Sequence, residues 1–230
     1  MVDMLTGSVF FGAFISLAFY EVGLACRRRW KLAVLNPLLI AICLTILLVR
    51  ACGIDYAVYN AGAKYLSYLL TPATICLAIP LYEQFRLLKD NWRAVLAGIV
   101  SGVVTSCVLV LALSALFGLS HAEYVTFLPK SITTAIGMGV SEQLGGYVSV
   151  TVASIIITGV LGNIIAEPVC RLFRITDPVA RGIGIGSASH AIGTARAMEL
   201  GEVEGAMSGL SIAVSGVLTV LAAAVFSAVY

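Results

Sequence analysis

Apolar runs long enough to cross a lipid bilayer dominate this sequence. A helix needs about 20 apolar residues to span the hydrocarbon core. Five runs of this kind lie at 5–25, 35–50, 92–117, 147–172 and 205–229. A sixth run at 66–82 contains Pro72 and Pro80, which predict a broken helix. The pattern predicts an all-α polytopic membrane protein with about six spans.

The composition favours the same class of protein. Of the 230 residues, 60% are hydrophobic and only 11% are charged, whereas soluble domains carry roughly 25% charged residues. A soluble enzyme would lack the polar residues to cover its surface, and no catalytic triad or nucleic-acid motif is visible. The six cysteines are scattered without a CxxC pair, so they predict buried hydrophobic positions rather than a metal site. We expect no enzyme activity, no metal and no nucleic-acid partner.

The basic residues predict the orientation of the spans. They gather in three clusters, at 27–31, 86–93 and 171–181. The loops between them, near 51–64 and 118–126, hold no basic cluster. Six spans place all three clusters on one side, which the positive-inside rule makes the cytoplasm. The first run has its basic cluster after it, so it predicts a first span rather than a cleavable signal. Both termini are then outside a bacterial cytoplasmic membrane.

Two stretches are too polar and too rich in glycine to face lipid. They are PKSITTAIGMGVSEQLGG (129–146) and GIGSASHAIGTARAMELGE (184–202). At an offset of 56, six of the fifteen residues 131–145 are identical to their counterparts, and Ser131 falls on Ser187. An apolar span follows each stretch. The sequence therefore predicts two units of polar hairpin plus helix, at 127–172 and 184–229, after N-terminal helices at 35–117, all in one transport domain over 1–230.

The predicted topology gives these two units opposite orientations. Inverted repeats whose broken or re-entrant segments meet near the bilayer midplane are typical of secondary transporters. Non-helical backbone is tolerated at that depth only where protein or a water-filled cavity covers it. Lys130 would cost at least about 2.5–3.5 kcal/mol at the bilayer centre, so we expect it to face a cavity. A lysine, hydroxyl groups and the N-termini of two half-helices together predict a site for a small carboxylate.

The candidate substrate-binding residues come from both stretches. They are Lys130, Ser131, Thr133, Thr134, Ser187, Ser189, His190, Thr194 and Arg196. Several have a structural alternative. Lys130 could lie at a membrane interface, the hydroxyls could cap a half-helix, and His190 could be an ordinary buried histidine. Arg196 could bind a carboxylate or pair with Glu199 or Glu202. Glu142 and Asn163 are candidates for proton or ion coupling, with H+ or Na+ as the coupling ion and no other cofactor expected.

The same residues resemble a known family. PKSITTAIGMGVSEQLGG and ASHAIGTARAMELGEVEGAMSGL (188–210) look like the two signatures of the LrgB/CidB family. NPLL (36–39) and TPATICLAIPLYEQ (71–84) are similar to its earlier blocks. Phe127, Gly137 and Gly139 depart from the usual pattern, which has small residues or alanines there. The resemblance covers nearly the whole chain.

This resemblance implies two kinds of function. Bacterial members are called antiholin-like and are linked to murein hydrolase control and lysis, beside a small LrgA/CidA-type holin-like partner. Plant relatives are glycolate/glycerate transporters, and some bacterial relatives are tied to pyruvate uptake. We favour a secondary transporter of small monocarboxylates or 2-hydroxy acids that works as a homo-oligomer. The alternative is an antiholin-like regulator, for which Gly98 and Gly102 would be candidate contacts with another membrane helix.

Overall fold

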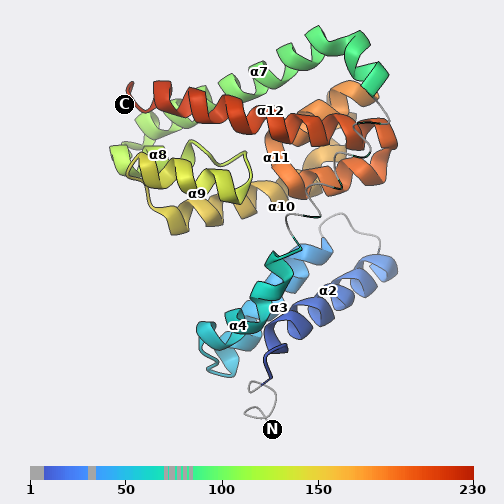
Figure 1. Cartoon of the computed structure of the whole chain (residues 1–230), viewed down its shortest axis with the longest axis vertical. Coiled ribbons are helices and arrows are strands. Elements are labelled where there is room, and N and C mark those ends of the chain that lie inside the picture. Colours follow the sequence, from blue (N-terminus) through green and yellow to red (C-terminus); the bar gives the residue numbers. More distant parts are fainter. Residues whose placement is uncertain are drawn as a thin grey trace. The chain divides into compact units, whose positions relative to one another are not determined.

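A computed structural model describes residues 8–30, 35–69 and 85–230, with single positions at 72, 76, 79 and 82. Every regular element in this described part is a helix, so the predicted all-α polytopic membrane class is confirmed (Figure 1). Three helices are long and apolar enough to cross a membrane: Lys89–Phe117, Val148–Leu172 and Glu202–Phe226. They match the runs predicted at 92–117, 147–172 and 205–229.

The other three predicted spans do not correspond to any of these three long helices. Pro37–Ala51 is an apolar helix, but it is shorter than the three long ones. The run at 5–25 corresponds to a helix that begins at Phe11 and carries three arginines in its last turn. The run at 66–82 lies largely outside the described residues. The count of six crossings therefore stays a prediction.

The chain divides into two compact units, 1–76 and 77–230. The first contains α2 (Phe11–Trp30), α3 (Pro37–Ala51) and α4 (Tyr56–Ser67). Asn36 caps α3, since its side-chain oxygen accepts hydrogen bonds from the backbone N–H of Leu38 and Leu39. α2 packs against both α3 and α4. The expectation of one transport domain over 1–230 stays a prediction.

The described part of the second unit, 85–230, contains six helices, and Figure 1 shows their arrangement. They are α7 (Phe85–Phe117), α8 (His121–Phe127), α9 (Thr134–Gln143), α10 (Val148–Leu172), α11 (Pro178–Leu200) and α12 (Glu202–Phe226). Its core gathers apolar side chains from α7, α8 and α12, including Ile99, Tyr124 and Met207. The short helix α8 begins with a capping box between Ser120 and Glu123. Hydrogen bonds from the Ser120 backbone N–H and hydroxyl lower the pKa of the exposed Glu123 carboxyl.

Each polar stretch forms a hairpin of two short helical segments. In the first, α8 and α9 flank a turn at 128–133, and Thr151 Oγ1 donates to Thr126 O (3.0 Å) and lies 2.7 Å from Ser141 Oγ. The second lies mostly in α11, which is helical except at His190, where φ is 42° and ψ is −144°. The helix folds back there, and this brings Gly193 close to Ile185. A Cβ at Gly193 would lie 3.2 Å from Ile185 Cγ2. The two predicted polar hairpins are thus mostly helical, and their tips are irregular.

The helices that follow the two hairpins run in opposite directions. α8 holds the start of α10, since Tyr147 N donates to Thr126 Oγ1 (2.8 Å). It also holds the end of α12, since Tyr124 Oη donates to Phe226 O (2.9 Å). The end of α10 and the start of α12 both lie beside α11, at Glu167 and Glu204. An inverted repeat requires this antiparallel arrangement.

Candidate functional site

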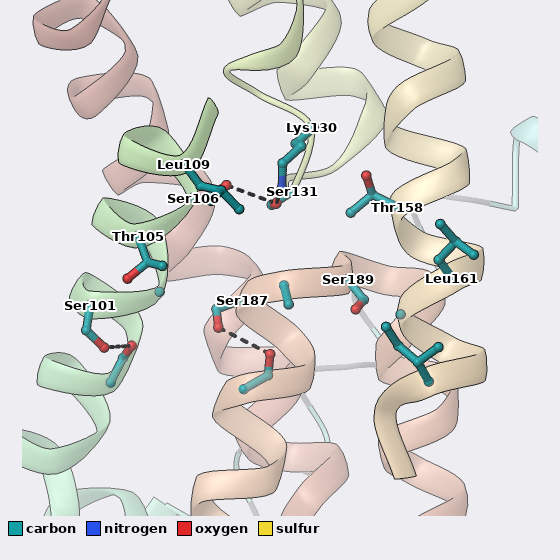
Figure 2. A pocket seen from close by; sticks show the side chains of 16 residues that line it. Ser101, Thr105, Ser106, Leu109, Lys130, Ser131, Thr158, Leu161, Ser187 and Ser189 are labelled. Atoms are coloured by element: carbon teal, nitrogen blue, oxygen red, sulfur yellow. Dashed lines mark hydrogen bonds between the residues drawn. The ribbon is translucent and has the colours of Figure 1, made fainter. Parts of the chain in front are cut away.

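The tips of the two hairpins meet at a cavity of about 580 Å³. Four parts of the second unit form its walls: α7, the tip at 130–131, α10 and the first half of α11. Figure 2 shows Lys130 and Ser131 between α7 and α10, with Ser187 and Ser189 on α11 across the space. Seven hydroxyl side chains line the cavity: Ser101, Thr105, Ser106, Ser131, Thr158, Ser187 and Ser189. The site is therefore hydroxyl-rich on every side.

Lys130 is the only charged side chain among the described residues that line the cavity. Its Nζ donates a hydrogen bond to Ser131 Oγ at 3.0 Å. Ser131 Oγ in turn lies 3.3 Å from Ser106 Oγ on α7. An ammonium carries three N–H donors, so this contact leaves Lys130 able to donate to a ligand.

The cavity lies near the middle of two membrane-spanning helices. Its α7 residues run from Gly98 to Leu109, around the midpoint of Lys89–Phe117. Its α10 residues run from Thr158 to Ile165, just past the midpoint of Val148–Leu172. Irregular backbone and a charge are tolerated at such depth where they line a polar cavity. The two hairpin tips and Lys130 meet this condition.

Glycines allow the tip of α11 to pack between α7 and α10. A Cβ at Gly102 would lie 3.0 Å from Ser187 Oγ, and one at Gly162 would lie 1.8 Å from Ser189 Oγ. A Cβ at Gly98 would lie 3.1 Å from Ile183 Cγ2. Gly98 and Gly102 therefore pack against α11 within the chain, rather than forming the contact with another membrane helix that the GxxxG spacing suggested.

Three predicted residues brace the tip of α11 and do not line the cavity. His190 is buried, and its Nε2–H donates to Ile155 O on α10 at 2.9 Å. Thr194 Oγ1 donates to His190 O (3.0 Å) and lies 2.7 Å from Ser208 Oγ on α12. Asn163 Nδ2 donates to Ile192 O at 2.8 Å. These contacts fix the second half of α11 against α10 and α12.

The remaining predicted residues lie away from the described lining of the cavity. Arg196 pairs with Glu167 on α10 and with Glu199, which is the structural alternative that the sequence left open. Thr133 precedes α9 without making a side-chain cap bond, and Thr134 is the first residue of that helix. Glu142 is exposed near the end of α9. The structure thus brings together Lys130, Ser131, Ser187 and Ser189, whose role in binding stays a prediction.

The hydroxyl residues of the spanning helices were not predicted from the sequence. Ser101, Thr105 and Ser106 lie on one face of α7, at positions i, i+4 and i+5. Thr158 faces them from α10 (Figure 2). A helical stripe of hydroxyls in an otherwise apolar span was the signal that could have identified them.

Antiparallel helices long enough to span a membrane, and two hairpins whose tips meet at a cavity lined by hydroxyl groups, define an all-α polytopic membrane protein. The chain belongs to the LrgB-like family, whose sequence pattern matches residues 16–229. It is 36% identical over 222 residues to the antiholin-like protein LrgB of Bacillus mycoides (strain KBAB4), covering 96% of each chain.

Two other relatives have the same name and a similar degree of identity. The antiholin-like proteins LrgB of Bacillus cereus (strain B4264) and Bacillus anthracis (strain CDC 684 / NRRL 3495) are each 35% identical over 222 residues, again covering 96% of each chain. No solved structure matches the chain.

Proposed function

We propose that this protein is a secondary transporter of small monocarboxylates, including 2-hydroxy acids of the glycolate, glycerate and lactate kind and 2-oxo acids such as pyruvate. The observation that carries the proposal is the position of Lys130, in a mid-span cavity between the tips of two inverted hairpins. Such a site, at the interface of inverted repeats, is typical of carriers that work by alternating access.

The lining of the cavity suits a small monoanion. One ammonium balances one carboxylate, and charge-assisted hydrogen bonds are about twice as strong as neutral ones. Serine and threonine hydroxyls can donate to a carboxylate and also accept from a substrate hydroxyl. A second carboxylate would find no further cation among the described lining residues. The site therefore favours monocarboxylates over dicarboxylates.

A second candidate function rests on the names of the relatives. They are called antiholin-like, which favours a regulator that restrains a small holin-like membrane protein and so controls murein hydrolase activity and lysis. Such a regulator would depend on the outer surfaces of its helices. It would tolerate the loss of Lys130, which lies inside the chain.

Uptake into proteoliposomes distinguishes these functions. We would measure uptake of labelled glycolate, lactate and pyruvate with and without imposed pH and Na+ gradients, for the native chain, Lys130→Ala and Lys89→Ala. Lys89 is the matched control because it is an exposed lysine near the start of α7, outside the cavity. Removing one partner of a buried charged contact costs about 2–5 kcal/mol. We therefore expect Lys130→Ala to lower uptake at least about 30-fold, with Lys89→Ala close to native.

Each of three outcomes distinguishes the two functions. Saturable uptake that is lost only in Lys130→Ala establishes the carrier and its site. Uptake at normal affinity in Lys130→Ala shows that the site is elsewhere. No uptake by folded native protein, alone or with its holin-like partner added, overturns the transport function and leaves the regulator.

A further inference from the structure

A second, smaller cavity adjoins the one that contains Lys130. Its volume is about 210 Å³, and it lies between α10 and the first half of α11. The two cavities share five wall residues: Gly162, Ile165, Gly184, Ala188 and Ser189. Three of these are glycine or alanine, so Ile165 is the only bulky side chain in the common wall. The two spaces are therefore neighbours that share one wall, the Ile165 partition.

The smaller cavity extends in one direction, toward the end of α10. The Lys130 cavity uses α10 residues 158–165, whereas the smaller one uses residues 162–170. At 1.5 Å rise per residue, the two together follow about 18 Å of α10. The smaller cavity then reaches Ile175 in the loop before α11 and Arg181 in the first turns of that helix. Its far end lies at the basic cluster 171–181, which the charge pattern places in the cytoplasm.

Arg181 puts a cation at this far end. Its Nε donates to Ile175 O at 2.8 Å, and its Nη1 lies 3.8 Å from Glu204 Oε1 on α12. This ion pair is long for a hydrogen bond. A guanidinium has five N–H donors, so these contacts leave donors for a passing carboxylate. The remaining wall is mostly apolar, with Val169 and Cys170 on α10 and Ala180 on α11.

We propose that the smaller cavity is the segment of the transport route between the Lys130 site and the cytoplasmic end of α10, gated at the Ile165 partition, and that Arg181 receives the carboxylate at its mouth. The inference rests on the proposed transport function. It explains why the residues of the common wall other than Ile165 are small. Movement of the α11 hairpin against α10 would open the partition, as alternating access requires.

The test separates binding from passage. Ala180 lines only the smaller cavity and is exposed, so Ala180→Phe fills the mouth without touching the Lys130 cavity. Ala195→Phe is the matched control, because Ala195 is an exposed residue on the second half of α11 that lines neither cavity. For the acid that the native chain takes up, we would measure equilibrium binding to purified protein and uptake into proteoliposomes. We expect Ala180→Phe to keep its Kd within about twofold and to lose uptake at least tenfold, while Ala195→Phe keeps both.

A chemical block gives a second, independent measurement. Cys170 and Cys107 are both buried, but Cys170 lines the smaller cavity and Cys107 lies in the hydrophobic core. In chains that keep one of these two cysteines, N-ethylmaleimide adducts are quantified by mass spectrometry. We expect the fraction alkylated at Cys170 to match the fraction of uptake lost, with binding preserved.

Three outcomes decide the proposal. Loss of uptake with binding intact in Ala180→Phe supports the route. Native uptake in Ala180→Phe, or in protein fully alkylated at Cys170, overturns the route while leaving the carrier function standing. Absence of both binding and uptake in the native chain overturns the carrier function itself, and the route with it.

Discussion

At the scale of single residues, the smallest side chains shape the site as much as the charged one does. Gly159 and Gly162 on α10 lie against His190 and Ser189 at the tip of α11. Any side chain at these two positions would push the tip away from α10. The position of Ser187 and Ser189 across the cavity from Lys130 therefore depends on the absence of side chains at Gly159 and Gly162.

Gly162→Ala should destabilise the protein. Its Cβ would lie 1.8 Å from Ser189 Oγ and 2.5 Å from Ser189 Cβ, and overpacking of this kind costs typically 1–3 kcal/mol. The matched control is Gly139→Ala on α9, where a Cβ meets no atom within 4 Å. Unfolding by SDS titration in mixed micelles should show a loss of stability for Gly162→Ala and none for Gly139→Ala. Equal stability of the two variants would contradict the close approach of α10 and α11.

Arg196 distinguishes an ion pair from a substrate contact. Because its guanidinium joins Glu167 and Glu199 and does not line the cavity, Arg196→Gln should weaken the contact between α10 and the second half of α11. We expect a lower unfolding midpoint, with a KM for uptake within about threefold of native. The comparison is with Lys130→Ala, in which uptake should fail. A KM raised tenfold or more in a well-folded Arg196→Gln protein would place Arg196 in contact with the substrate.

At the scale of elements, hydrophobic patterning predicted the long helices but not the hairpins in detail. The runs at 147–172 and 92–117 agree within three residues with α10 and with the spanning part of α7. Apolar length is enough for that prediction. The polar stretches were expected as broken or re-entrant hairpins because glycines and hydroxyls interrupt their apolar pattern. Most of them are nevertheless helical, since tertiary packing of glycine faces against neighbouring helices overrides helix propensity.

The predicted site residues that line the cavity are those near the tips of the two hairpins. The offset of 56 aligned Ser131 with Ser187, and both line the cavity. The sequence also implicated Thr194 and Arg196, but the reversal of direction at His190 carries them toward α12 and the end of α10. A reversal at one non-glycine residue has no local sequence signal, because any such prediction requires the contacts that hold it.

At position 190, glycine should give a more stable protein than alanine, which is the reverse of the usual order in a helix. In regular helix, glycine is about 0.5–1 kcal/mol less stable than alanine. At φ 42° and ψ −144° a Cβ is strained, by about 1–3 kcal/mol. Both His190→Ala and His190→Gly lose the hydrogen bond to Ile155 O, so their comparison isolates the backbone. We expect His190→Gly to be the more stable of the two, whereas Ala195→Gly, in the regular part of α11, should be less stable than native. The opposite order at position 190 would show that α11 continues unbroken there.

At the scale of the whole molecule, membership of the LrgB-like family and the helical fold agree on a membrane protein. The orientation in the membrane is a separate matter that the charge pattern alone addresses. The basic cluster 171–181 lies at the end of α10, and the α8 end of the second unit, around residues 118–126, carries no such cluster. The positive-inside rule therefore predicts that α8 lies outside and that the loop between α10 and α11 lies in the cytoplasm.

Cysteine labelling tests this orientation from both sides. His121 and Thr176 are exposed and lie at opposite ends of α10, the first on α8 and the second in the loop before α11. In a chain whose six native cysteines are replaced, His121→Cys should react with an impermeant maleimide added to intact cells. Thr176→Cys should react only after permeabilisation or in inverted vesicles. The reverse pattern would invert the topology and put the mouth at Arg181 on the outer surface. Labelling of both from one side would show that α10 does not cross the membrane, and neither cavity could then serve a transport route.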